Sequence, residues 1–137
     1  MGLEKDFMER ELKKLVLLLT GLIEQVGGLS SKNANETLPD IDSTIQKEFG
    51  FTLRDLSKMG DKDLLENAEN LHPSALEKLS ELLFTLVTND AFSKIVTDID
   101  KNELAHKTIV IIDFLNDQSD TFSLQRMQMR AVLDPTD

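Results

Sequence analysis

The sequence predicts an all-α fold of six or seven helices, and three observations support this. The first is a stripe of apolar residues that recur every three or four positions within residues 6–26: Met8, Leu12, Leu15, Leu19, Leu22 and Val26. The second is that the apolar residues downstream also recur at helical spacing. The third is that no segment shows the alternation of apolar and polar residues that marks a half-buried strand. Such a stripe needs partner helices, so we expect antiparallel helical hairpins around one core.

Length and composition indicate one globular domain over residues 1–137. A chain of this length matches the size of a single domain, and 40% hydrophobic with 29% charged residues is not the composition of a disordered chain. Cysteine is absent, which excludes disulfides, thiolate zinc sites and cysteine nucleophiles. The fold therefore has to be stabilised by packing.

The charge balance limits the possible partners. The chain is acidic, with 25 acidic and 15 basic residues and a net charge of −10, and it has no basic block. Nucleic-acid binding requires Lys and Arg to replace counterions, so we expect none. The apolar run over residues 15–23 is far shorter than the roughly 20 residues of a membrane span, and acidic residues precede it where an export signal is basic. We therefore expect no membrane partner and a cytoplasmic location.

The first helix is expected over residues 6–26. Gly27 and Gly28 follow it, and glycine accepts the left-handed conformation that closes many helices. Residues 29–38 are rich in Ser, Lys, Asn and Glu, which predicts a mobile loop.

Short helices are expected over residues 39–71. Pro39 suits a first helical turn, where Asp40 and Asp42 would favour the positive end of the helix dipole. Gly50 is expected to end this helix. Thr52 and Asp61 are then expected to cap two further short helices, the second of which ends near residue 71.

Helical hairpins are expected over residues 73–133. Pro73 predicts the start of a helix that we expect to be central and most buried, with the stripe Leu76, Leu79, Leu83, Leu86 and Val87. A break or bend is expected at Asn89 and Asp90. Asp100 or Asn102 is expected to begin the next helix. The last helix is expected over residues 121–133, capped by Ser119 or Asp120.

The sequence has few candidates for chemistry. Asp98, Asp100 and Asn102 match the first ligand positions of a calcium loop, but Glu103 stands where the loop needs glycine and Ile109 where it needs a bidentate glutamate. We therefore expect helix capping at this segment instead of cation binding.

The other signatures of an active site are also missing from the sequence. His72 and His106 show no metal-binding spacing, so we expect a loop or capping role for the first and a surface position for the second. No nucleophile elbow or glycine-rich phosphate loop is present. We therefore expect no cofactor, no metal and no enzymatic activity.

The C-terminal helix carries the candidate site. Arg126 and Arg130 lie four residues apart, and Met127 and Met129 flank them. This mixture of basic and adaptable side chains suits an acidic partner in a helical or extended conformation. The alternative is structural: Phe122, Met129 and Leu133 dock the helix on the core while the arginines pair with nearby acids.

The pattern of helices resembles the tetratricopeptide-repeat class. The features that suggest it are the opening helix of residues 6–26, the residues Phe51 to Leu65, the core helix with Leu79, Leu82 and Leu83, and the residues Thr121 to Arg126. Residues 120–133, after the helix pair of residues 73–117, look like the closing repeat of an uncharacterised bacterial family of small helical proteins. The resemblance implies a helical scaffold that can self-associate, and no known activity.

These observations together predict a helical protein–protein interaction or scaffold module that binds a protein or peptide. The wide apolar stripes also permit a homodimer through the first helix. The alternative is a small-ligand-binding protein or enzyme with a pocket between helices, which would use acidic residues and His72 or His106.

Overall fold

A computed structural model describes residues 2–134, with side chains from residue 6 onward, and every regular element in that range is a helix. The all-α prediction is therefore confirmed for these residues. They form eight helices where six or seven were expected, because the segment after residue 89, where a break or bend was expected, is a separate helix. The elements are α1 (Gly2–Gly27), α2 (Ala34–Phe49), α3 (Leu53–Lys58), α4 (Asp61–Glu69), α5 (Pro73–Val87), α6 (Asp90–Ile95), α7 (Lys101–Gln118) and α8 (Leu124–Leu133).

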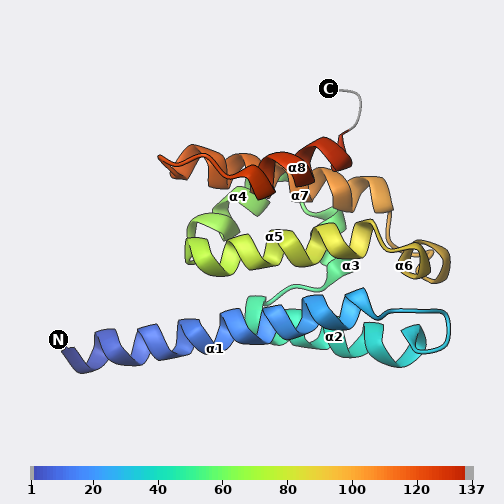
Figure 1. Cartoon of the computed structure of the whole chain (residues 1–137), viewed down its shortest axis with the longest axis horizontal. Helices are drawn as coiled ribbons and strands as arrows, with labels where there is room; N and C mark the ends of the chain where they lie inside the picture. The colour runs from blue at the N-terminus through green and yellow to red at the C-terminus, as the bar shows by residue number, and fades with distance from the viewer. Residues whose placement is uncertain (1, 135–137) are drawn as a thin grey trace.

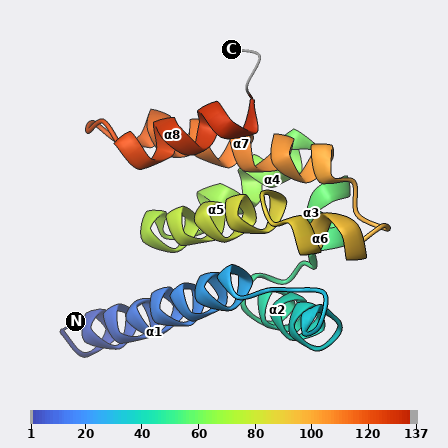
Figure 2. The same ribbon diagram turned by 45° about the vertical axis from the view of Figure 1, so that its right-hand side comes forward.

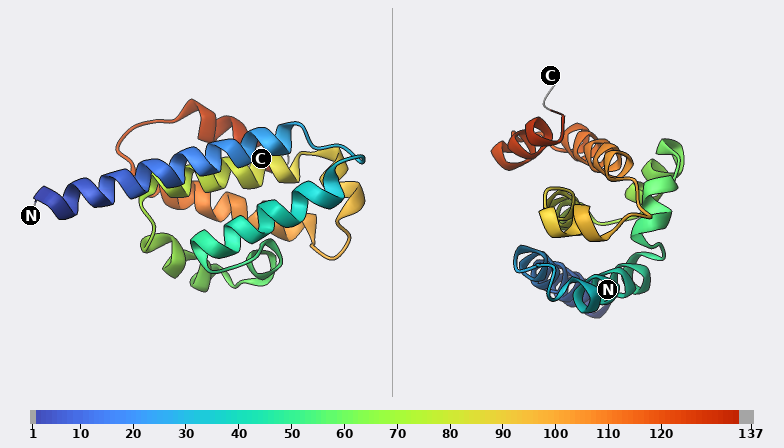
Figure 3. Two further views of the ribbon diagram at one scale, coloured as in Figure 1. Left: turned by 90° about the horizontal axis from the view of Figure 1, so that it is seen from below. Right: turned by 90° about the vertical axis from the view of Figure 1, so that its right-hand side faces the viewer.

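The helices form three tiers, with α1 and α2 in the first, α5 and α6 in the second, and α7 and α8 in the third (Figures 1 and 2). The chain reverses direction between α5 and α7 and again between α7 and α8, as a succession of antiparallel helices does (Figure 1). Helices α3 and α4 lie along one side of the three tiers, from the level of the first tier to that of the third (Figure 3, right). None of the described helices is long and apolar enough to cross a membrane.

Helix α5 is the centre of the core, as its apolar stripe predicts. Eight of its residues are buried, and they face both α1 and α7: Ala75, Leu76, Leu79, Ser80, Leu82, Leu83, Leu86 and Val87. Helix α1 contributes Leu19, Leu22 and Val26, and α7 contributes Leu104 and Ile111. A helix that is apolar around most of its circumference has to be enclosed by other elements, and the middle tier provides that position.

The end of α1 agrees with the prediction, although the mechanism differs. The helix ends at Gly27, and the N–H of Gly28 donates to the carbonyls of Glu24 and Gln25 at 3.2 Å. Among the described residues, only Gly50 has a positive φ, of 84°, and its N–H donates to the carbonyl of Gln46 at 2.9 Å. The left-handed closure that we expected after α1 occurs instead after α2.

The expected loop over residues 29–38 is wrong in extent. Helix α2 begins at Ala34, and Leu29 and Leu38 are buried. Asn33 closes the short connection, because its side chain accepts from the N–H of Ser30 at 2.8 Å and donates to the carbonyl of Gly28 at 3.1 Å. The missed pattern was the apolar spacing Ala34, Leu38, Ile41 and Ile45, all of which are buried.

Pro39 therefore lies inside α2 and not in its first turn. A proline there removes the N–H that would bond to the carbonyl four residues earlier, but burial of the apolar face on both sides of it outweighs this loss. Asp42 has a different role from the one predicted. Its carboxylate accepts from the N–H of Leu53 at 2.8 Å, so it satisfies a donor in the first turn of α3 and not one of its own helix.

Most helix starts follow the capping residues that the sequence predicts, with two corrections. Thr52 and Asp55 form a capping box at α3, and Asp100 accepts from the N–H groups of Asn102 and Glu103 at α7. Asp61 does not cap α4, because the N-cap residue is Gly60 and Asp61 is the first helical residue. The last helix starts at residue 124 and not 121, because Ser123 accepts from the N–H of Arg126.

The layered core predicts that two leucines differ in their contribution to the free energy of unfolding. We expect Leu83→Ala, which empties a fully buried site on α5, to lower the free energy of unfolding by about 2–5 kcal/mol. Leu17 is 71% exposed on α1, so we expect Leu17→Ala to change it by less than about 0.5 kcal/mol. Urea denaturation followed by circular dichroism measures both. Equal losses in the two variants would contradict the assignment of α5 as the core.

Candidate functional site

Two of the four predicted contact residues hold α8 on the body of the protein. Arg126 and Met129 are each only 5% exposed. The guanidinium of Arg126 donates from Nε to Oδ1 of Asn116 at 2.7 Å and from Nη1 to Oε1 of Glu77 at 2.6 Å. These bonds tie α8 to α7 and α5 at once. Arg126 and Met129 are therefore too buried to contact a partner while α8 is docked.

Arg130 is more accessible, but its charge is also paired. Its guanidinium contacts the carboxylate of Asp113 on α7 through two bonds, Nε to Oδ1 at 2.8 Å and Nη2 to Oδ2 at 3.3 Å. This fork geometry fixes the side chain at the edge of the α7–α8 pair. Both arginines thus follow the structural alternative that the sequence left open.

The face of α8 that points away from the core is apolar. Met127 is 49% exposed, Leu124 55% and Val132 57%, and Phe122, just before the helix, is 75% exposed. Helix α8 therefore docks with the face that holds Arg126 and Met129 and has a second, apolar face whose residues Leu124, Met127 and Val132 stay exposed. A surface helix normally has a polar outer face, so this second face needs a reason.

A groove of about 740 Å³ adjoins this face, between the end of α7 and α8. Met127, Phe122 and Ala131 supply its apolar surface, and Ser119, Thr121 and Asn116 supply hydroxyl and amide groups. The hydroxyl of Ser119 bonds to the Thr121 hydroxyl at 3.0 Å and accepts from the N–H of Thr121 at 3.2 Å, which shapes the connection before α8. We name this groove, with Phe122, Met127, Arg130 and Ala131 in its lining, the outer-face groove; the exposed Leu124 lies on the same helix but outside the lining.

The electrostatics of the outer-face groove differ from the sequence prediction. Asp120 lines the groove, and the guanidinium of Arg130, which also lines it, is paired with Asp113. The protein as a whole carries −10. The basic surface that would attract an acidic partner is absent from this groove. Its charge favours basic partners.

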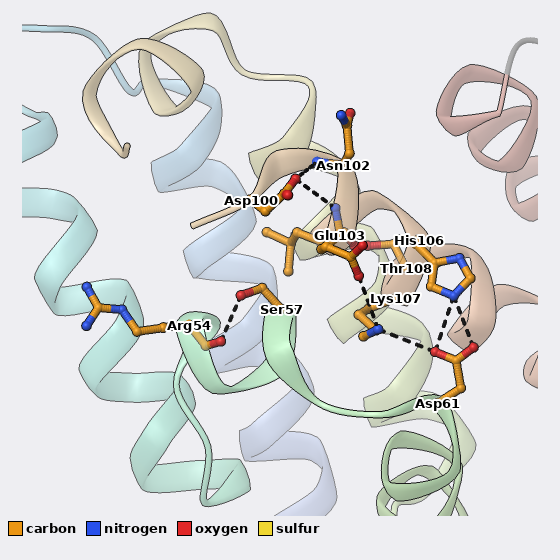
Figure 4. Close-up of polar contacts among 10 residues, drawn as sticks. Arg54, Ser57, Asp61, Asp100, Asn102, Glu103, His106, Lys107 and Thr108 are labelled. Atoms are coloured by element: carbon orange, nitrogen blue, oxygen red, sulfur yellow. Dashed lines mark hydrogen bonds and ion pairs between the residues drawn. The ribbon is translucent and has the colours of Figure 1, made fainter. Parts of the chain in front are cut away.

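A polar cluster joins α4 to α7 on another part of the protein (Figure 4). The imidazole Nε2 of His106 lies 3.0 Å from Oδ2 of Asp61, and the Lys107 ammonium donates to Oδ1 of Asp61 at 3.4 Å. Lys107 also forms an ion pair with Glu103 at 3.5 Å, and its side chain is only 7% exposed. We define Asp61, Glu103, His106 and Lys107 as the α4–α7 cluster.

The α4–α7 cluster joins two helices through one carboxylate, that of Asp61. The hydrogen bond from His106 lowers the pKa of the Asp61 carboxyl below its usual value, Lys107 acts in the same direction, and burial opposes both only in part. Asp61 is the first residue of α4, where a carboxylate also suits the helix dipole. One carboxylate therefore holds two neighbouring side chains of α7, the imidazole of His106 and the ammonium of Lys107, and fixes the start of α4 against α7.

The histidines do not line the cavities described here. His106 is on an exposed helix face, and His72 caps α5 by accepting from the N–H of Ser74 at Nδ1. These are the surface and capping roles that the sequence predicts. Neither the outer-face groove nor a second cavity of about 380 Å³ between α2, α3 and α6 includes a histidine.

The residues of the partial calcium pattern have structural roles. Asp98 forms an ion pair with Arg54, Asp100 caps α7, and Asn102 contributes its backbone N–H to that cap. Within residues 6–134 no group of three or more potential ligands could hold a metal ion.

Sequence reasoning missed the α4–α7 cluster and the burial of Lys107. The position of Lys107 on α7, between Leu104 and Ile111 on the buried face, gave a local indication of burial, since these three residues recur at helical spacing. The partner carboxylate of Asp61 is 46 residues away in the chain, and no local pattern connects the two.

Comparisons of the chain with protein-family models, with curated proteins and with solved structures find no significant match.

The two arginines of α8 provide a matched test of its docking. We expect Arg126→Ala to destabilise the protein by about 1.5–3 kcal/mol, because it removes the buried guanidinium whose hydrogen bonds to Glu77 and Asn116 join α8 to α5 and α7. We expect Arg130→Ala to cost less than about 1 kcal/mol, because its ion pair with Asp113 is accessible to water. Chemical denaturation of both variants measures the difference. Equal costs would contradict the docking role of Arg126.

The Asp61 carboxylate should make stability depend on pH. Its pKa is lower in the folded protein, so it stabilises the fold above the unfolded-state value of about 4, and this contribution disappears as the pH falls through the folded pKa. We expect Asp61→Asn to be less stable than the unmodified protein at pH 6, by at most about 1 kcal/mol because the pair is half exposed, and the difference to shrink below about pH 4. Denaturation curves across this range measure it. Asp63→Asn, an exposed carboxylate on the same helix, is the control.

Proposed function

We propose that this protein is a helical interaction module that binds a segment of another protein in the outer-face groove. The observation that carries the proposal is the second apolar face of α8, where Phe122, Leu124 and Met127 are about half exposed or more beside a groove of about 740 Å³. Exposed apolar patches of this kind mark binding sites in stable monomers. Phenylalanine and methionine suit the role, since they supply a large apolar contact area and methionine adapts to its partner.

The partner that fits best is an amphipathic helix with basic residues beside its apolar face. Helices that dock into grooves present apolar anchors at helical spacing, and the exposed side chains of α8 at positions 124, 127 and 131 recur at the same spacing. Asp120 at the groove and the net charge of −10 favour Lys or Arg on the partner. The proposal thus replaces the acidic partner predicted from Arg126 and Arg130 with a basic one.

The scaffold behind the groove belongs to the same proposal. We infer a tetratricopeptide-repeat-like organisation for residues 73–133, in a cytoplasmic protein without enzymatic activity. The antiparallel order of α5, α7 and α8 supports the first part, because stacked antiparallel helices present grooves between neighbours (Figure 1). Helix α5 also packs against α1, a contact outside the series α5, α7 and α8.

Helical peptide display tests the groove directly. We expect peptides selected on the immobilised protein to combine apolar anchors at helical spacing with Lys or Arg, and to bind more weakly as salt is raised. Met127→Asp and Phe122→Asp should each weaken this binding by about tenfold or more, since they place a charge on the apolar surface.

A matched variant distinguishes binding in this groove from non-specific binding to exposed apolar residues. Leu65 is an exposed leucine on α4, outside the groove, so Leu65→Asp should leave peptide binding unchanged. Circular dichroism of each variant verifies that the fold is intact. Peptides enriched in acidic residues, or binding that Met127→Asp and Leu65→Asp weaken equally, would contradict the proposal.

A further inference from the structure

The cavity between α2, α3 and α6 is separate from the outer-face groove. Its volume is about 380 Å³, and the two cavities have no lining residue in common. The three helices that form it lie close together at one end of the protein (Figure 2). Pockets for small molecules usually have volumes of about 300–1,000 Å³, so this cavity matches the lower end of that range.

The walls of the cavity are mostly apolar and continuous with the core. The apolar lining residues are Leu38, Pro39, Leu53, Phe92, Val96 and Ile99. Leu38, Leu53 and Phe92 also belong to the buried core cluster, so the inner wall is fixed by packing. The side chain of Asn89 accepts from the N–H of Phe92 at 3.0 Å, which holds the start of α6 in place. A preformed apolar wall of this kind suits the apolar body of a small ligand.

The charged groups of the cavity leave one carboxylate without a cation. Asp42, Asp98 and Arg54 all line the cavity. The Arg54 guanidinium forms an ion pair with Asp98, and both side chains are more than half exposed. Asp42 is half-buried, and its carboxylate accepts from a neutral donor, the N–H of Leu53, at 2.8 Å. Within residues 6–134 no basic side chain forms an ion pair with Asp42.

This arrangement of charges favours a cationic ligand over a neutral or an anionic one. A half-buried carboxylate attracts a cation more strongly than a fully solvated one does, because the local dielectric constant is lower. An anion would meet two carboxylates and a guanidinium that is already paired. A neutral apolar molecule would contact the walls but would gain nothing from Asp42. An ammonium group attached to an apolar body makes use of both features.

We propose that the cavity between α2, α3 and α6 binds a small organic amine, with its ammonium at the Asp42 carboxylate and its apolar body against Phe92 and Val96. A carboxylate offers about four acceptor positions, so the bond to the Leu53 N–H leaves room for an ammonium donor. The site is distinct from the peptide groove, and either proposal can fail while the other holds.

Titration of the full chain with benzylammonium, followed by amide NMR spectroscopy, tests the site. The N–H of Leu53 is a direct reporter, because it donates to the carboxylate that the ammonium would contact. We expect saturable shifts of the Leu53 and Val96 amide signals at millimolar ligand. Benzyl alcohol has nearly the same shape without the charge, so it should bind at least about fivefold more weakly. Benzoate should bind more weakly still.

Two aspartates of α2 provide matched variants. Asp42→Asn removes the charge but keeps an oxygen that can accept from the Leu53 N–H, so α3 should stay in place. We expect it to weaken benzylammonium binding by about fivefold or more and to leave benzyl alcohol binding unchanged. Asp40 is exposed on the same helix and does not line the cavity, so Asp40→Asn should change neither. Circular dichroism verifies that both variants are folded.

Several outcomes would overturn the proposal. They are the absence of saturable shifts at the cavity, equal binding of benzylammonium and benzyl alcohol, and equal effects of Asp42→Asn and Asp40→Asn. Nα-acetyl-lysine methylamide carries the same ammonium on a thinner chain and should bind more weakly, because it covers less of the apolar wall. Equally tight binding of this compound would also overturn the proposal, since a lysine side chain of another protein would then be the occupant.

Discussion

The burial of α5 from two sides is the constraint on which the other packing depends. Eight of its fifteen residues are buried, and α1 and α7 have to supply the surfaces that enclose them. This requirement sets the order of the three tiers. It also explains why α1 and α7, which are distant in the sequence, lie on opposite sides of one helix. The remaining helices connect these tiers or extend them.

Polar contacts fix elements that have too little apolar surface to fix themselves. Helices α3 and α4 are short, and Asp42, Thr52 and Asp61 position them through bonds to backbone N–H groups or to α7. Helix α8 buries little more than Met129 and Arg126, and the Arg126 guanidinium ties it to two other helices. Single charged residues therefore have a structural role in this protein. From the sequence alone, the same residues could equally have been assigned to partner binding.

Two exposed apolar surfaces arise where a helix has more apolar surface than the core covers. Helix α8 docks with one face and leaves Leu124, Met127 and Val132 on the other. Helix α1 docks with one half of its length and leaves Met8 in the other. The two surfaces differ in their charged residues, since Asp120 and the paired Arg130 line the groove at α8 whereas residues 6–19 hold equal numbers of acidic and basic side chains.

The sequence by itself determined the all-α class, the central position of α5, and most of the helix ends, because spacing and capping are local properties of the chain. Thr52, Pro73 and Asp100 act within a turn of their own position, so their roles could be predicted. Tertiary structure decided the rest. Whether Arg126 faced a partner or Glu77 depended on a residue 49 positions away, and how much of the α1 stripe was covered depended on the length of α5. Neither distance is encoded in a local pattern.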